Sequence, residues 1–174
     1  ILKPEDFEKG LDVLLTNIKR IPPSSVDPTI KNYHWLDLVT GMLDAYENDH
    51  HTAILIDEKN NISEGPGFNI FSVDKTGLNT PDHGVLEGIT RQTVINLAKE
   101  LKIPINIKPI SINKLKSSEE VFATSTAGGV MPITKISGKP IGLGTPGKIT
   151  REIHKVYWNK HSDPGWSLSI EDII

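Results

Sequence analysis

The sequence predicts an α/β domain in which strands and amphipathic helices alternate along the chain. Three segments place apolar residues at the spacing of one helix face. Between them lie short apolar or alternating runs that end in glycine, proline, asparagine or aspartate, as strands do before turns. The chain has 174 residues, of which 37% are hydrophobic, and this is enough for one domain with a core of its own.

The composition narrows the class of protein. The sequence contains no cysteine, which excludes a disulfide framework and a thiolate metal site. The adjacent His50 and His51 invite a metal interpretation, but adjacent side chains face apart, so a polar turn is favoured and no metal is predicted. A formal net charge of −3 gives no general reason to expect a nucleic acid or a membrane surface as partner. These features fit a cytoplasmic protein. The first residue is Ile1 rather than methionine, so the lack of a targeting signal says little.

The first third of the chain predicts a strand and a helix separated by a proline-rich segment. Residues 1–10 are polar and acidic and are expected to form a connector, and the run 11–20 is predicted as a strand. Prolines in the segment 22–30 make it rigid and non-helical. A helix is predicted over residues 33–47 because five apolar residues share one helix face. These residues are Trp35, Leu38, Val39, Met42 and Tyr46.

The middle of the chain predicts two strands, a hairpin and a second helix. The apolar run 53–56 is a strand followed by a polar turn, and residues 68–73 form a strand that ends in the hairpin turn Asp74–Gly77. After residue 88 the apolar spacing becomes helical again. The residues on that helix face are Val94, Leu97, Ala98 and Leu101.

The last third predicts an edge strand, a hairpin and a third helix. Prolines near both margins of 103–112 are typical of an edge strand. The remaining elements are a turn of helix at 115–120, a strand at 120–124, a hairpin formed by 130–136 and 140–141, a helix at 147–161 and a loop-like tail from residue 162. The third helix has Ile149, Ile153 and Val156 on one face.

Lys31 is the first candidate for chemistry. It follows the rigid proline segment and precedes the first predicted helix, and such a junction can present a side chain to a cleft. Taken alone, Lys31 is more simply one solvated lysine among many.

Three other segments could bind a small polar ligand. Glu64 opens a Gly-Pro-Gly turn, whose glycines let the backbone approach a flat group closely; a plain hairpin turn with a solvated carboxylate is the alternative. Gly88, Ile89 and Thr90 begin a helix, where free N–H groups and the helix dipole attract anions, although Thr90 could simply cap its own helix. The small, hydroxyl-rich segment 125–129 suits a phosphate or carboxylate, but it also suits an ordinary tight turn.

Together, a lysine, a carboxylate and two anion-binding segments are the groups that bind pyridoxal 5'-phosphate (PLP). Five blocks of the sequence, in order, also resemble one enzyme family. They are DPTIKNYHWLDL, ISEGPGFNIF, GVLEGITRQTV, EVFATSTAGGVMPI and GKITREI. The chain resembles the fold-type IV, class IV PLP-dependent aminotransferases over nearly its whole length, from about Leu11. DPTIKN preceded by IPP is most similar to the (R)-selective amine transaminase branch.

The resemblance implies the large C-terminal domain of this family, a twisted, barrel-like mixed sheet packed by helices, formed by residues 11–174. It also implies transamination between an amino acid or amine and a 2-oxo acid or ketone. Lys31 would form the Schiff base with the cofactor aldehyde, which requires a neutral amine, and would then act as general base and acid. Glu64 would face the pyridine nitrogen.

The resemblance also assigns the phosphate and the substrate. Gly88, Ile89, Thr90 and Thr126 would bind the cofactor phosphate, and Thr126 with Ala127 would face the substrate. Family members have a smaller N-terminal domain with a phosphate-binding arginine, and they form homodimers. This chain shows no counterpart of that domain, so residues 1–10 would connect to a missing one. A lyase that uses the same site, as in aminodeoxychorismate lyases, and a catalytically silent fragment remain alternatives.

Overall fold

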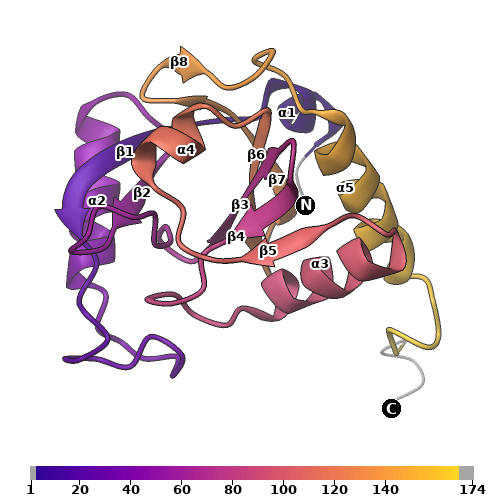
Figure 1. Cartoon of the computed structure of the whole chain (residues 1–174), viewed down its shortest axis with the longest axis horizontal. Helices are drawn as coiled ribbons and strands as arrows, with labels where there is room; N and C mark the ends of the chain where they lie inside the picture. The colour runs from indigo at the N-terminus through magenta and orange to yellow at the C-terminus, as the bar shows by residue number, and fades with distance from the viewer. Residues whose placement is uncertain (1–2, 169–174) are drawn as a thin grey trace.

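The computed structural model describes residues 3–168, and in them helices and strands alternate as the sequence predicts (Figure 1). The helices are α1 (Pro4–Lys9), α2 (Leu36–Glu47), α3 (Ile89–Glu100), α4 (Ile112–Lys116) and α5 (Lys148–Lys160). The strands are β1 (Leu11–Lys19), β2 (Thr52–Ile56), β3 (Asn69–Asp74), β4 (Gly77–Thr80), β5 (Ile105–Ile107), β6 (Glu120–Ser125), β7 (Gly129–Ile136) and β8 (Lys139–Pro140).

The strands form one mixed sheet that curls towards closure. Its order is β2-β1-β7-β6-β3-β4-β5, with β8 paired to β7. Pairs β1–β2, β1–β7 and β4–β5 are parallel, and the other pairs are antiparallel. The segment 62–64 links the two ends, because Leu55 N donates to Glu64 O (3.0 Å) and Ile62 N donates to Ile110 O (2.7 Å) beyond β5. The barrel-like mixed sheet is therefore confirmed.

Both faces of this sheet are buried, because successive side chains of a strand point to opposite faces. In β6, Val121 and Ala123 belong to the core inside the curl, and Phe122 belongs to the core beneath α3 and α5. Phe122 stacks there on Phe71 of β3 with 5.0 Å between the ring centroids. In β2, Ile54 faces the inside while its neighbours Ala53 and Leu55 pack under α2.

Several element boundaries differ from the prediction. Residues 4–9 of the expected connector form α1, whose Phe7 is buried and lies 4.0 Å, between ring centroids, from His154 of α5. The strand predicted at 103–112 is shorter in the structure and covers only Ile105–Ile107. It lies at one end of the strand order, as predicted for an edge strand. The helical turn expected at 115–120 lies earlier, because Ser111 caps α4 by accepting from Lys114 N. The predicted tail is described only to residue 168.

The first long helix also buries a different face from the predicted one. It begins at Leu36 rather than residue 33, and Trp35 and Tyr46 are exposed. The buried residues are Leu38, Gly41 and Ala45. Gly41 allows the close approach, because a Cβ there would lie 2.8 Å from Leu55 of β2. The helices α3 and α5 bury the faces that the sequence predicts.

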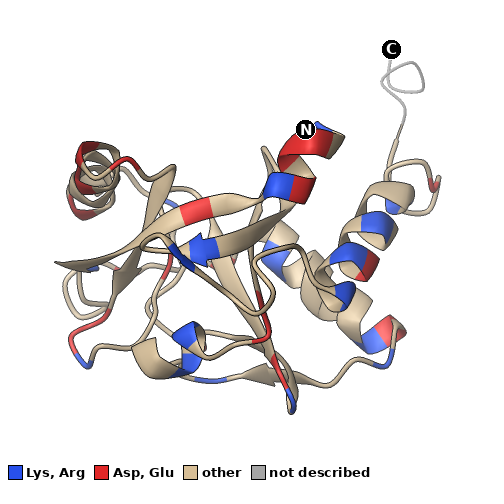
Figure 2. Cartoon of the chain, turned by 90° about the horizontal axis from the view of Figure 1, so that it is seen from above, with Lys and Arg blue, Asp and Glu red and all other residues tan. Residues whose placement is uncertain are grey.

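Charge is distributed without a dominant sign. Figure 2 shows acidic and basic residues interspersed over the helices and loops, whereas the strands carry few of them. Among the described residues, no helix is long and apolar enough to cross a membrane. The same residues contain no group of three or more metal-ligating His, Asp or Glu side chains.

Asp74, at the end of β3, ties α4 to the hairpin. Its carboxylate accepts from Lys114 Nζ (2.8 Å) and from Thr76 N (2.6 Å). Burial favours a higher pKa for this carboxyl, but the hydrogen bonds from Lys114 and Thr76 outweigh it and hold the pKa of Asp74 well below its ordinary value of 3.8.

A lowered carboxyl pKa stabilises the folded state above the unfolded-state value and loses that contribution as the pH falls. We therefore expect Asp74→Asn to lower the free energy of unfolding at neutral pH and to weaken its decline below about pH 3.8. Urea unfolding over a pH series measures both effects. An acid decline as steep in the variant as in the wild type would show that Asp74 is not its source.

Candidate active site

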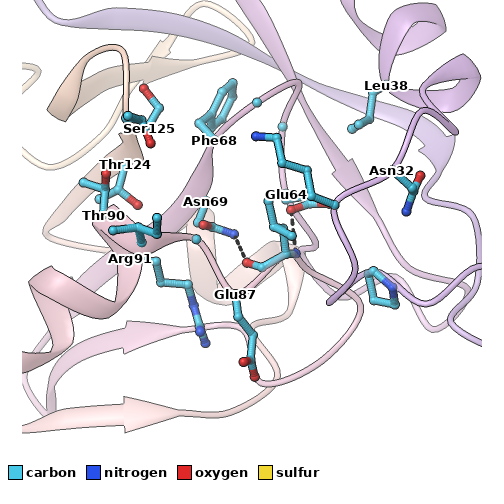
Figure 3. A pocket seen from close by; sticks show the side chains of 18 of the residues that line it. Asn32, Leu38, Glu64, Phe68, Asn69, Glu87, Thr90, Arg91, Thr124 and Ser125 are labelled. Carbon is cyan, nitrogen blue, oxygen red and sulfur yellow. Dashed lines mark hydrogen bonds between the residues drawn. The ribbon is translucent and has the colours of Figure 1, made fainter.

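A cavity of about 330 Å³ opens between α2, the start of α3 and the end of β6 (Figure 3). Four segments far apart in sequence line it: the loop before α2, the turn before β3, the entry to α3 and the end of β6. Of the predicted site residues, Lys31, Glu64, Gly88, Ile89, Thr90 and Thr126 all line this cavity. Ala127 lies in the same turn as Thr126 but does not line the cavity.

Lys31 lies in an exposed loop that local hydrogen bonds shape. Asp27 accepts from Thr29 N (2.9 Å) in an Asx turn. Beyond Lys31, Asn32 O accepts from Trp35 Nε1 (3.0 Å), which folds the indole back over the loop. The helix begins only at Leu36, so Lys31 is held by a loop and not by a first helical turn. Its side chain is exposed and lines the cavity.

Glu64 is buried rather than solvated. It is 5% exposed, its Oε1 accepts from Arg20 Nε (3.1 Å), and its Oε2 accepts from Leu86 N (2.9 Å). Arg20 also pairs with Asp37 of α2 (2.7 Å). Burial raises the pKa of the Glu64 carboxyl, while the Leu86 N–H and the Arg20 charge oppose the rise. The turn that follows needs Gly65, because a Cβ there would lie 2.0 Å from the Phe68 ring.

The entry to α3 is fixed from two sides. Leu86 N donates to Glu64, and Leu86 O accepts from Asn69 Nδ2 (2.8 Å) of β3, as the dashed lines in Figure 3 show. The N-cap is Gly88, and no side chain caps this helix among the described residues. Thr90 is therefore not the cap of its own helix, and the N–H groups of the first turn are available to an anion.

The turn after β6 is closed by a serine. Ser125 Oγ accepts from Gly128 N (2.9 Å), and Ser125 pairs with Gly129 at the start of β7. This hydrogen bond leaves Thr126 and Ala127 exposed at the tip of the turn. The segment is thus a tight turn, and its first half also borders the cavity.

Sequence reasoning missed several residues of the site. Arg20, Asn69 and Thr124 line the cavity and are buried. Arg20 directly follows β1 and precedes Pro22 and Pro23, but a single arginine there has no distinguishing pattern. Asn69 begins β3 and Thr124 lies near the end of β6, each next to an apolar run. A polar residue beside such a run is the available signal.

Comparisons with known proteins identify the family and the fold of the chain. The profile of the family described as amino-transferase class IV matches residues 2–136. A branched-chain-amino-acid aminotransferase from Escherichia coli K12 is 31% identical over 160 residues, which are 90% of this chain and 52% of that protein. A branched-chain amino acid aminotransferase from T.th., solved with pyridoxamine 5'-phosphate, superimposes with a TM-score of 0.90 at 29% identity. That comparison covers 95% of this chain and 57% of the other.

The chain belongs to the class IV aminotransferase family. It spans about half the length of the curated relatives that it matches. The fold matches that of the C-terminal domain of such proteins.

The buried Arg20–Glu64 pair gives a stability test. Arg20→Ala leaves the buried carboxylate of Glu64 and the partly buried carboxylate of Asp37 without their cation. Breaking a buried pair in this way costs on the order of 3 kcal/mol. The Glu64 pKa would rise further. A carboxyl whose pKa is raised in the folded state favours folding below its ordinary pKa of 4.5, and this contribution is lost as the pH rises. The stability lost in Arg20→Ala should therefore be larger at neutral pH than near pH 4.5.

Arg151→Ala is the matched control, because Arg151 pairs with Glu8 at the surface, where both side chains are largely exposed. Such exposed pairs are screened by water and contribute little to stability, so this variant should lose clearly less than Arg20→Ala. Chemical unfolding of both variants measures the difference. An equal loss in the free energy of unfolding in the two variants would mean that the buried Arg20–Glu64 pair stabilises the fold no more than an exposed pair does.

Proposed function

We propose that this chain is the cofactor-binding part of a PLP-dependent aminotransferase, which moves an amino group between an amino acid or amine and a 2-oxo acid or ketone. The observation that carries the proposal is that a lysine, a buried carboxylate and a helix N-terminus border one cavity. Family membership supports it, as does the pyridoxamine 5'-phosphate in the structure of a similar protein.

The residues around the cavity fit the parts of PLP. The first-turn N–H groups of α3 at Gly88, Ile89 and Thr90 would hold the phosphate, with Thr126 beside them. Glu64 would face the pyridine nitrogen, and Lys31 at the rim would reach the aldehyde. Bound PLP supplies an electron sink for bond breaking at the substrate Cα.

The chain's own groups would then do the following work. Glu64 would keep the pyridine nitrogen protonated, and Arg20 would hold the carboxylate in place for this. Lys31 Nζ would act as the general base and acid that takes the proton from the substrate Cα and returns it during the transfer. Thr126 and Ala127, at the exposed turn, would face the acid or carbonyl end of the substrate.

The rest of the protein would complete the site. We assign residues 11–174 to the PLP-binding large domain and residues 1–10 to the connection with a smaller N-terminal domain. That domain would supply an arginine to the phosphate and part of the substrate pocket. A cytoplasmic homodimer with small-molecule donors and acceptors follows from the same interpretation.

The role of Lys31 is tested by covalent trapping. Borohydride treatment of the PLP-loaded protein should fix the cofactor to Lys31, so the added mass survives denaturation. In Lys31→Ala the added mass should be absent, and transamination should fall by at least about 100-fold, the lower end for loss of a positioned general base.

Lys155→Ala is the control, because Lys155 is an exposed residue of α5 that does not line the cavity. This variant should retain both the added mass and the activity. Wild-type labelling in Lys31→Ala would assign the covalent role to another lysine.

A further inference from the structure

One hydroxyl in the cavity wall lacks a partner. Thr124 is 1% exposed and lines the cavity, and its Oγ1 has no hydrogen-bond partner in the part of the chain that the structure describes. A buried hydroxyl without a partner costs free energy, and a valine would fill the same space in a strand without that cost. A threonine at this position is therefore explained by a group that enters the cavity.

The strand geometry fixes which end of the cavity Thr124 borders. Val121 and Ala123 point into the curl of the sheet, so Thr124 shares the opposite face with Phe122, the face that α3 covers. Its cross-strand partner is Asn69, which holds the entry to α3 through Leu86 O. Figure 3 shows Thr124 at the same end of the cavity as Thr90 and Ser125, away from Asn32 and Leu38.

This end of the cavity suits an anion. The first-turn N–H groups of α3 face it with the positive end of the helix dipole. Gly88 can lie close to the sheet only because it lacks a side chain, since a Cβ there would be 2.3 Å from Asn69 Oδ1. The hydroxyl of Thr124 thus borders the place where the backbone N–H groups converge.

We propose that Thr124 Oγ1 donates a hydrogen bond to the phosphate group that binds at the start of α3. This assignment rests on the proposed function and adds a phosphate ligand from the middle strand β6 to the predicted ones. The phosphate would give the hydroxyl the partner that residues 3–168 do not supply, so the cost of burying it is recovered on binding.

The test separates phosphate binding from binding of the rest of the cofactor. Dissociation constants for PLP and for pyridoxal, which lacks the phosphate, are measured by spectral titration of the purified protein. Thr124→Val removes only the hydroxyl. We expect it to reduce the preference for PLP over pyridoxal about tenfold, as for a hydrogen bond to a charged group.

The variant should also be at least as resistant to urea as the wild type without ligand, because an unpaired buried hydroxyl has been removed. Thr124→Ser, which restores a hydroxyl, should return the preference for PLP towards the wild-type value. Ser72→Ala is the matched control, because Ser72 Oγ on β3 is another buried hydroxyl with no hydrogen-bond partner among residues 3–168 but does not line the cavity. It should leave the preference unchanged.

An unchanged preference in Thr124→Val, or an equal loss of affinity for PLP and pyridoxal, would overturn the assignment and leave the proposed function standing. The first result would also be expected of a hydroxyl that bonds only to water. If the wild type binds neither PLP nor pyridoxal, the proposed function fails and this assignment fails with it. The same holds if Lys31→Ala binds PLP and the spectrum of the bound PLP is identical to that in the wild type.

Discussion

The site depends on the buried carboxylate of Glu64. It is held by Arg20 from the end of the strand β1 and by the N–H of Leu86 from the entry to α3, while Arg20 also pairs with Asp37 of α2. A charge of this kind is expensive to bury and is tolerated only with a complete set of partners. Three segments far apart in sequence must therefore meet at one carboxylate, and their meeting creates the cavity.

The fold makes that meeting possible because its sheet is buried on both faces. Cores on either side of the sheet fix the strands, so the polar groups at their ends are held by a rigid framework while the loop with Lys31 lies at the surface. The backbone of Leu86 is bonded at both of its polar groups: its N–H donates to Glu64 and its C=O accepts from Asn69. The predicted nitrogen-binding and phosphate-binding ends of the site are thus linked through one fixed residue.

The sequence predicts most of this fold because apolar periodicity follows directly from burial. The pattern of apolar residues alone predicts the strands around Ile54 and Phe122 and the helix face of Val94 and Leu97. The first long helix shows the limit. Trp35 and Tyr46 have the right spacing but stay exposed, whereas Gly41 faces the sheet because only a small residue fits against Leu55. The spacing of apolar residues shows which side of a helix is apolar, but it does not show how much room lies between that helix and the sheet.

The candidate site was predictable to the extent that its residues stand in motifs. Glu64 opens a glycine turn, and Thr90 lies in the first turn of the helix that follows Gly88, so both have local signals. Arg20 and Thr124 have none, because their importance comes from partners, or the lack of a partner, that only the folded chain reveals. The barrel-like curl of the sheet was expected from resemblance rather than from any pattern of polarity.

The most direct test of the central claim is the ¹⁵N chemical shift of the ring nitrogen in ¹⁵N-labelled PLP bound to the protein. If the buried carboxylate of Glu64 faces that nitrogen, the shift should be that of a protonated pyridine and should stay so across neutral pH. A shift typical of an unprotonated nitrogen, titrating as in free solution, would contradict the placement of the cofactor on which the proposed chemistry rests.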